Sequence, residues 1–566
     1  MAWYDKAVFY HIYPLGLTNA PKENNYGEVE HRLNTLIPWI SHIKEIGCNA
    51  LYIGPLFESV GHGYETTDYK KLDRRLGDNK DLTDFVAECH RQGVKVILDG
   101  VFNHTGRDFF AFKDIQEKRE HSPYKDWYCN VNFEGNNEYN DGFSYENWGG
   151  YNLLIKLNQR NPEVQNYIGD VIRFWVSEYD IDGIRLDTAD VLDFEYMNCL
   201  RQVANEVKPD FWLMGEVIHG DYTRWVNEGT LHSVTNYQLH KALYSGHNDH
   251  NYFEIAHTVK RLYEMGGNQP DRLKLYNFVD NHDVERIYTK LNNKAHFTPV
   301  HVLLYTLPGI PSIYYGSEFG IEGKKEQFSD ASLRPALSLD DFKDAVTANS
   351  FTRLIASLGH IRQQSEALSC GDYKELLLTN RQYAFSRTTD KDCAIVTVNN
   401  DDNPCTLTVA SGDGCFVGAL SGEKVTSCNG AITVTVAGNS GEIWLLESTS
   451  YSDACSPIQV EVTDTAAHTQ QTKALSKPSA ARKNNTSDGQ KTFCTEQEDS
   501  CDTPKTSKQE PASPSASQDF EKGIIAGLQE AIIARMEKNG PVTEQMKRDV
   551  YNNEHHDSLI NWIKSF

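Results

Sequence analysis

The sequence predicts an α/β fold: a (β/α)8 TIM barrel with an inserted subdomain after its third strand, followed by a C-terminal antiparallel β-sandwich. Two observations predict it. Strand-like and helix-like stretches alternate from residue 8 to about 366, and eight such units in one run fit a closed parallel barrel better than an open sheet. From about residue 370, short alternating strands separated by turn residues replace this rhythm, which indicates a separate domain.

The first three β/α units occupy the N-terminal hundred residues. We expect strands at 8–13, 50–53 and 94–98 and helices at 33–46 and 81–92. The second helix ends at Gly93, because glycine commonly adopts the left-handed conformation that terminates a helix.

The alternation stops after His104 and resumes at about Asn161. The intervening residues are rich in Asn, Gly, Tyr and Trp, and they are too many for a plain connection. We therefore expect an inserted domain at 105–161, with the catalytic barrel formed by residues 1–104 and 162–366.

The second part of the barrel begins with a helix whose first residue is Pro162, a position where proline is tolerated. The remaining predicted helices are 162–179, 194–207, 221–228, 251–265, 296–306 and 351–366, and the remaining strands are 182–187, 211–216, 233–238, 274–279 and 312–315.

Three segments follow the barrel. Residues 367–449 alternate apolar and polar side chains and predict the β domain. Residues 450–517 are rich in Ser, Thr, Pro, Lys and Gln and predict a disordered linker. Residues 518–566 predict a helical tail, which we expect either to self-associate or bind a protein partner, or else to cover an apolar patch of the barrel. The apolar residues on one face of this helix are Phe520, Ile524, Leu528 and Ile532.

The composition excludes several classes of function. A net charge of −24 and a pI near 5.3 argue against nucleic-acid binding, which needs basic patches. No apolar run approaches the ~18 residues of a membrane helix. The N-terminus lacks a basic segment followed by an apolar core, so we expect a cytoplasmic protein, in which the twelve cysteines are mainly buried free thiols.

Four hydrophobic runs end in an acid. Asp99, Asp187, Glu216 and Asp283 close the predicted strands three, four, five and seven. The active sites of such barrels lie at the carboxyl ends of the strands, so these acids are expected around one mouth. One such acid would be read as a helix cap or a surface charge, but four in series predict an enzyme.

The segments around these acids resemble the four signature regions of the α-amylase family of glycoside hydrolases, in order and in spacing. They are Asp-Gly-Val-Phe-Asn-His at 99–104, Gly-Ile-Arg-Leu-Asp at 183–187, Gly-Glu-Val at 215–217 and Phe-Val-Asp-Asn-His-Asp at 278–283. The resemblance covers residues 3 to about 450. It implies a retaining hydrolase that cleaves α-1,4-glucosidic bonds of malto-oligosaccharides or cyclodextrins by double displacement.

The resemblance also implies a role for each residue. Asp187 would be the nucleophile, Glu216 the general acid and base, and Asp283 the stabiliser of the distorted sugar ring. The residues that the resemblance assigns to substrate binding are Tyr64, Asp99, His104, Arg185, His282 and Arg334. For Tyr64 the alternative is a core tyrosine, and for Arg334 it is a surface charge. We expect Asp99 to orient its neighbours and not to react.

Leu-Ile-Lys-Leu-Asn at 154–158 resembles an extra signature of the neopullulanase, cyclomaltodextrinase and maltogenic amylase group, which carries proline at the position of Ile155. Members of that group have an additional N-terminal β domain. Here the first barrel strand begins by residue 8, so we expect no such domain.

Further departures concern metal and linkage. Asp190 and Val191 replace the lysine and histidine of typical α-amylases, which removes a family calcium ligand and a sugar contact. We therefore expect no cofactor and no metal, with calcium at Asn103 as the alternative. Thr188 resembles members acting on α-1,4 bonds. A transglycosylase, an enzyme active on α-1,6 bonds and a non-catalytic glycan-binding relative remain as competing hypotheses.

Overall fold

The computed structural model describes residues 2–267, 273–327 and 329–447. The predicted linker at 450–517 and the predicted helical tail at 518–566 lie outside the described residues.

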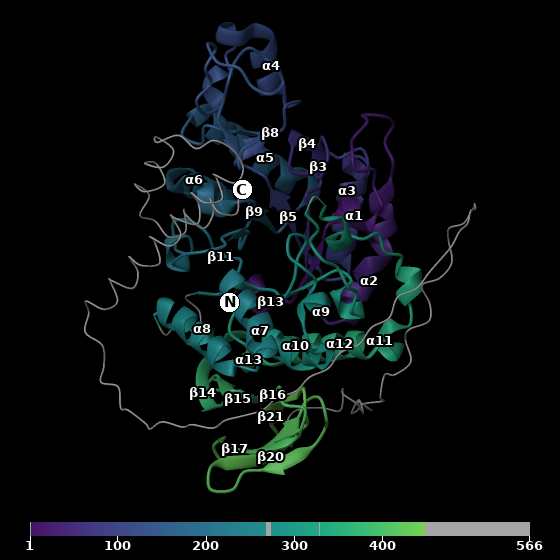
Figure 1. The fold of residues 1–566 in the computed structure, drawn as a ribbon, viewed down its shortest axis with the longest axis vertical. Coiled ribbons are helices and arrows are strands. Elements are labelled where there is room, and N and C mark those ends of the chain that lie inside the picture. The colour runs from purple at the N-terminus through teal and green to yellow at the C-terminus, as the bar shows by residue number, and fades with distance from the viewer. Residues whose placement is uncertain (1, 268–272, 328, 448–566) are drawn as a thin grey trace, which may run out of the picture. The chain divides into compact units, whose positions relative to one another are not determined.

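Eight parallel strands form the barrel that the sequence predicts (Figure 1). They are β1 (Phe9–Ile12), β2 (Ala50–Ile53), β5 (Lys95–Gly100), β9 (Gly183–Leu186), β10 (Trp212–Gly215), β11 (Ser233–Val234), β12 (Tyr276–Asn277) and β13 (Ile310–Tyr314). Hydrogen-bonded neighbours run in the order β11-β10-β9-β5-β2-β1-β13-β12. A parallel bridge between Thr235 and Tyr276, together with the bond from Asn236 N–H to Tyr276 O at 2.9 Å, joins the two outer strands and closes the barrel.

Helices follow the strands and surround them (Figure 1). The longer ones are α2 (Ile37–Glu45), α3 (Asn79–Arg91), α5 (Pro162–Tyr179), α6 (Phe194–Val207), α7 (Tyr237–Asn248), α8 (Tyr252–Met265), α10 (Phe297–Thr306) and α12 (Ser350–Gln364). Their ends follow local sequence signals. The Asn161 side chain caps α5 by accepting from Glu163 N–H at 2.8 Å, and Asp193 caps α6 by accepting from Glu195 N–H at 2.9 Å.

One predicted helix is wrong. In place of a helix at 221–228, the chain makes a single 3-10 turn at Tyr222–Arg224. Asp221 accepts from Thr223 N–H at 3.0 Å, and Asn227 accepts from Gly229 N–H at 3.0 Å. These short side chains satisfy backbone donors locally and so compete with helix formation. The next strand is shorter than predicted because α7 begins inside the range 233–238.

The segment after β5 folds as a small unit beside the barrel. It contains a three-stranded antiparallel sheet of β6 (His104–Thr105), β7 (Asn147–Trp148) and β8 (Tyr151–Lys156), and helix α4 (Phe110–Lys118). Aromatic rings form its core; Phe112, for example, lies 5.4 Å from Tyr128 and 5.0 Å from Tyr145 between ring centroids. A hairpin of β3 (Phe57–Ser59) and β4 (Thr66–Leu72) follows β2.

The C-terminal domain is antiparallel, as the sequence predicts. Its larger sheet runs in the order β14-β15-β16-β21-β18-β19, and β17 pairs with β20. The strands are β14 (Asp372–Leu378), β15 (Gln382–Thr388), β16 (Cys393–Asn399), β17 (Cys405–Ala410), β18 (Cys415–Gly418), β19 (Lys424–Thr426), β20 (Ala431–Val436) and β21 (Ser440–Leu446). Residues of both sheets share one apolar core. Helices α10 and α13 (Glu366–Cys370) contact this domain (Figure 1).

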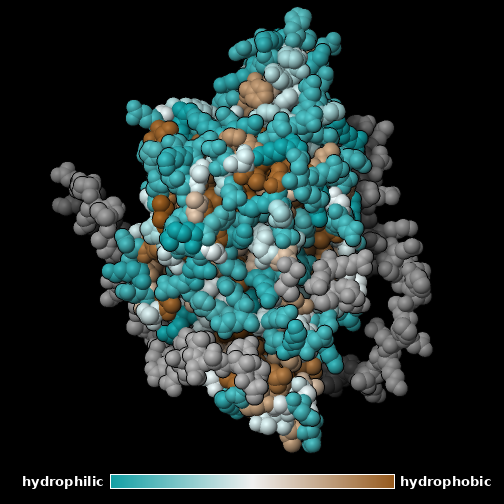
Figure 2. Space-filling model, turned by 180° about the vertical axis from the view of Figure 1, so that it is seen from behind, coloured by the Kyte–Doolittle hydropathy of each residue, from teal (hydrophilic) through white to brown (hydrophobic). Residues whose placement is uncertain are grey.

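The surface drawn in Figure 2 is mainly hydrophilic, and its hydrophobic residues form separate small groups. Across residues 2–267, 273–327 and 329–447, no helix is both long enough and apolar enough to cross a membrane.

Candidate active site

One buried arginine joins three carboxylates at the carboxyl ends of neighbouring strands. Arg185 of β9 donates from Nη1 to Asp99 Oδ1 and to Asp187 Oδ1, each at 2.9 Å. Its Nη2 lies 2.7 Å from Glu216 Oε2. Register places these groups together, since Asp99 on β5 is the parallel partner of Arg185. Arg185 and Asp187 are two residues apart and therefore share one face of the extended chain.

The backbone directly after Asp187 is left-handed. Thr188 has φ 47° and ψ 43°, a conformation that costs a β-branched residue on the order of 1–3 kcal/mol. In this conformation its N–H donates to Glu216 Oε2 at 3.1 Å, and its hydroxyl lies 3.4 Å from Asp187 Oδ2. Thr188 therefore contacts both acids of the predicted catalytic pair.

The carboxyl groups of this cluster share too few cations for all of them to be ionised cheaply. Burial raises the pKa of Asp187 well above its ordinary value. The positive charge of Arg185 opposes this shift, and the negative charges of Glu216 and Asp99 add to it. The Asp187 carboxyl accordingly retains its proton to a higher pH than a free carboxyl does.

Asp99 lies beside the predicted catalytic pair. Its Oδ2 accepts from the hydroxyls of Tyr52 at 2.9 Å and Tyr64 at 3.2 Å, and its Oδ1 accepts from Arg185. The side chain is buried, so protein donors occupy both oxygens. This arrangement suits a residue that orients Arg185 and Tyr64.

A second group gathers around Asp283. Its Oδ1 accepts from Arg334 Nη2 at 2.9 Å, and His282 Nε2 lies 2.9 Å from Oδ2. Burial opposes ionisation of Asp283, but the charges of His282 and Arg334 outweigh it and hold the pKa of this carboxyl well below its usual range. The Asp283 side chain is 34% exposed, more than that of Asp187 or Glu216, so it remains open to a ligand.

Arg334 and Tyr64 both belong to this group. Arg334 Nε donates to the His282 carbonyl at 3.0 Å, and its guanidinium lies 4.6 Å from the centre of the Tyr13 ring. The Tyr64 ring is nearly parallel to His282, at 14° and 5.9 Å, and its hydroxyl is 2.5 Å from Nε2. Arg334 is therefore held among these side chains and is only slightly exposed, and Tyr64 packs against both the barrel core and His282.

Sequence reasoning missed three tyrosines. Tyr13 stacks on His282 at 5.7 Å, Tyr52 binds Asp99, and the Tyr237 hydroxyl lies 3.4 Å from Glu216 Oε1. Tyr13 directly follows β1 and Tyr237 lies shortly after β11. Their positions at strand ends could have identified both as candidate site residues. Tyr52 lies inside a hydrophobic strand and carries no such signal.

His104 lies at the edge of the mouth, where β6 begins. It is almost fully buried, its ring centroid is 5.9 Å from that of Trp148, and its Nδ1 lies 3.1 Å from Asn103 Nδ2. His104 is one of the substrate-binding residues that the resemblance implies. Its contacts with Asn103 and Trp148 differ from those that hold Arg185 and Asp283.

The surroundings of Asn103 do not fit calcium. Its side-chain oxygen accepts from Gln159 Nε2 at 2.9 Å, and its amide nitrogen faces His104 Nδ1. Calcium binds six to eight oxygen atoms, whereas the two groups that contact this side chain are an N–H donor and an imidazole nitrogen.

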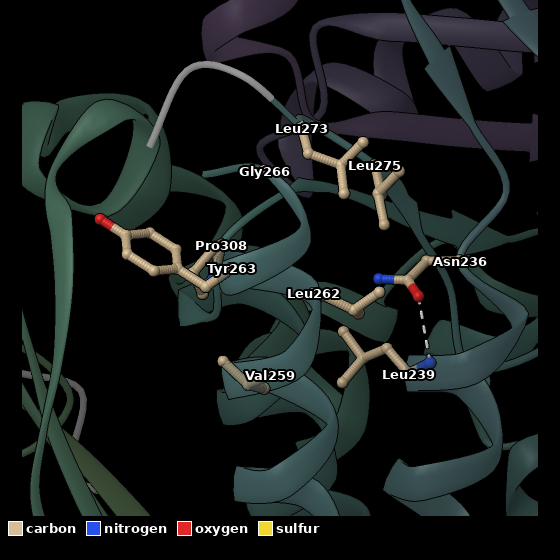
Figure 3. A pocket seen from close by; sticks show the side chains of 9 residues that line it. All are labelled: Asn236, Leu239, Val259, Leu262, Tyr263, Gly266, Leu273, Leu275 and Pro308. Atoms are coloured by element: carbon tan, nitrogen blue, oxygen red, sulfur yellow. Dashed lines mark hydrogen bonds between the residues drawn. The ribbon is translucent and has the colours of Figure 1, made fainter. Parts of the chain in front are cut away.

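Two other features lie away from the carboxylates. His31, Asp78 and Asp81 could approach one ion, but Asp81 Oδ2 already bonds His31 at 2.6 Å and Asp78 N–H at 2.8 Å at the start of α3. A cavity of about 30 Å³ lies between α7, α8 and the strand β12 (Figure 3). It has room for about one water molecule, and leucines line much of it, so it cannot hold a sugar ring.

Comparisons with known proteins agree with the geometry. Residues 12–362 match the family model described as alpha amylase, catalytic domain. A cyclomaltodextrinase from a Bacillus species is 31% identical over 435 residues, covering 73% of this chain and 75% of that protein. Neopullulanase 2 from Thermoactinomyces vulgaris is 30% identical over 469 residues, covering 78% of each. A solved cyclomaltodextrinase structure superposes with a TM-score of 0.69 at 26% identity, covering 78% of each chain.

The contacts of Asn103 predict that calcium neither binds there nor stabilises the fold. A ligand that binds only the native state raises the melting temperature. We therefore expect the same melting temperature after exhaustive dialysis against a chelator and after addition of millimolar calcium. Magnesium at equal ionic strength is the control. A rise in melting temperature with calcium alone would contradict this expectation.

Proposed function

Because this chain belongs to the α-amylase family of glycoside hydrolases and is an enzyme that acts on α-glucans, we propose that it cleaves α-1,4-glucosidic bonds of malto-oligosaccharides or cyclodextrins with retention of configuration. The observation that carries this proposal is the Arg185 guanidinium shared by Asp187 and Glu216. One guanidinium holds both carboxyls close together. Such a close approach is compatible with the spacing of ~5–5.5 Å that retaining enzymes need.

In the proposed first step Asp187 attacks the anomeric carbon. Arg185 Nη1 holds Oδ1, and Oδ2 has only the long contact with Thr188, so Oδ2 is the oxygen available for attack. The carbon–oxygen bond to the leaving sugar breaks as a β-glycosyl-enzyme forms.

Glu216 provides the proton for the leaving oxygen. Thr188 N–H and Arg185 hold its Oε2, whereas Oε1 has only the long contact with Tyr237. In the second step the same carboxylate takes a proton from water, which attacks the intermediate and releases the sugar. One proton on the pair suffices, since it leaves one carboxyl ionised and the other able to donate.

The group around Asp283 would bind the reacting sugar. An ionised carboxylate can accept hydrogen bonds from ring hydroxyls and stabilise positive charge that develops at the anomeric carbon. His282 and Arg334 keep it in that state. The nearby ring of Tyr64 offers an apolar face to the sugar.

Two related activities remain as alternatives. A transglycosylase would pass the same intermediate to a sugar in place of water, and an α-1,6-active enzyme would use the same acids on another bond. The names of the relatives, cyclomaltodextrinase and neopullulanase, support a maltodextrin or cyclodextrin substrate. A cytoplasmic location stays a prediction from the sequence.

The two acids should respond differently to the leaving group. We expect Glu216→Gln to lower kcat on maltotriose by about 10²–10⁴-fold. With a dinitrophenyl α-maltoside, whose leaving group needs no proton, the release of the first phenolate should be nearly restored. Asp187→Asn should lower kcat by on the order of 10⁴-fold or more with both substrates. The exposed Asp221→Asn is the control for charge removal. Equal losses in both variants on the activated substrate would refute the assignment.

The pH dependence should follow the ionisation of the proposed nucleophile. Asp187 attacks as a carboxylate, and burial together with the negative charges of Glu216 and Asp99 raises its pKa. We therefore expect kcat/KM to rise as pH rises through this raised pKa, above the range of free carboxyls. Asp99→Asn removes one of the negative charges, so this acid limb should move to lower pH. Glu228→Gln, an exposed substitution, should leave the profile unchanged. An acid limb that does not move in Asp99→Asn would contradict this account.

Product analysis separates hydrolysis from transfer. Incubation with maltotriose, β-cyclodextrin, pullulan and isomaltose should release maltose and glucose from the first two, with the α-anomer appearing first in a proton NMR time course. Products longer than maltotriose would favour the transglycosylase, and rapid cleavage of isomaltose would favour α-1,6 activity. First appearance of the β-anomer would exclude retention.

A further inference from the structure

A chain of hydrogen bonds links the loop after the nucleophile to His104 through one glutamine. Gln159 lies where the chain returns from the inserted unit to the barrel, between β8 and α5, and it is buried. Its Oε1 accepts from the backbone N–H of Asp193 at 2.6 Å, and its Nε2 donates to Asn103 Oδ1 at 2.9 Å. Asn103 Nδ2 then faces His104 Nδ1 at 3.1 Å.

The backbone N–H of Asp193 sets the direction of every hydrogen bond in this series. A backbone N–H can only donate, so the group facing Asp193 must be the carbonyl oxygen of Gln159. The amide of Gln159 must then donate to the oxygen of Asn103, and the amide of Asn103 must donate to Nδ1 of His104. An imidazole nitrogen that accepts a hydrogen bond carries no proton, so in the neutral ring the proton lies on Nε2.

The other side of the His104 ring agrees with this tautomer. Nε2 is buried and makes no hydrogen bond of ordinary geometry with the protein. Burial lowers the pKa of His104 to about 3, although the nearby carbonyl of Tyr64 favours a proton on the ring. The ring is therefore neutral, and the Tyr64 carbonyl is a nearby acceptor for its one N–H. Tyr64 is a residue of the proposed sugar site.

We propose that Gln159 is a positioning residue for the reaction: it sets the tautomer of His104, so that Nε2–H faces the Tyr64 carbonyl and helps to hold Tyr64 in the proposed sugar site. This inference rests on the proposed function, in which the Tyr64 ring contacts the sugar. Gln159 also ties the inserted unit to the loop at 188–193, which follows the nucleophile. The side-chain oxygen of Asn103 is thereby occupied by an amide.

The alternative interpretation is that Gln159 only accepts the hydrogen bond from the backbone N–H of Asp193 at the start of α6. The substitution Gln159→Glu separates the two interpretations. A glutamate keeps an acceptor for Asp193, but its second oxygen faces Asn103 Oδ1, which makes the amide of Asn103 rotate. His104 Nδ1 then faces an oxygen and must carry the proton.

The substitution Asn103→Asp reaches the same state by another route. An aspartate at this position still accepts from Gln159, and its other oxygen faces His104 Nδ1. Both variants should therefore move the His104 proton from Nε2 to Nδ1 or protonate both nitrogens. In Gln165→Glu the same charge is added on α5, where the native Nε2 donates to the backbone carbonyl of Gln159 and not to its side chain. It is the matched control.

The primary readout is the tautomer of His104 in the resting protein. Two-bond ¹H–¹⁵N correlation spectra of ¹⁵N-histidine-labelled enzyme report it, and His104→Asn assigns the signals. We expect a protonated Nε2 in the wild type and in Gln165→Glu, and a protonated Nδ1 in Gln159→Glu and Asn103→Asp. In Gln159→Glu, kcat/KM on maltotriose should fall about ten-fold, as expected for one lost hydrogen bond.

A proton on Nδ1 in the wild type would overturn the proposal, as would an unchanged tautomer in both variants. A changed tautomer with unchanged kcat/KM would overturn the claim that Gln159 positions His104 for the reaction. If the wild type cleaved no α-glucan, the proposed function would fail, and the tautomer would still show whether the hydrogen-bond chain works as described.

Discussion

The arrangement of the mouth depends on one buried guanidinium. Arg185 is the common partner of Asp99, Asp187 and Glu216, which end three adjacent strands. Burying charges costs more than pairing them returns unless the geometry is good, and removing one partner of such a group typically costs 3–5 kcal/mol. Three acids on one cation are therefore poor for stability. They suit chemistry instead, because an excess of negative charge keeps a proton that the reaction can use.

The barrel makes this cluster almost unavoidable. Parallel strands place their carboxyl ends at one edge, and the pairing of Asp99 with Arg185 fixes which side chains meet. Closing the structure at Thr235 and Tyr276 brings the strand before Asp283 round to the same mouth. The remaining adjustment is made by the strained backbone of Thr188, which turns its N–H toward Glu216.

The sequence predicted those parts of the protein whose cause is local. Acids at the ends of hydrophobic runs, Pro162 at a helix start and the alternation of strands after residue 370 each mark a feature within a few residues, and the barrel and the β domain followed from them. The helix predicted at 221–228 failed because Asp221 and Asn227 bond their own backbone. Tyr52 and Gln159 act on residues distant in sequence. Their roles depend on the register of strands and on the return of the inserted unit, which no local pattern reveals.

One physical rule applies to both halves of the site. Groups that can only donate hydrogen bonds determine the orientation or protonation of groups that can either donate or accept. Arg185 can only donate, so the oxygens it binds are acceptors, and a proton on Asp187 must lie on the oxygen away from it. The N–H of Asp193 can only donate, and two amides pass that direction on to His104. An amide or an imidazole alone could turn over at little cost. When such a group is anchored to a backbone N–H, it cannot turn over. Reversal would leave two acceptors, or two donors, facing each other in a buried site. The protein thus fixes proton positions on reversible groups without adding further buried charge.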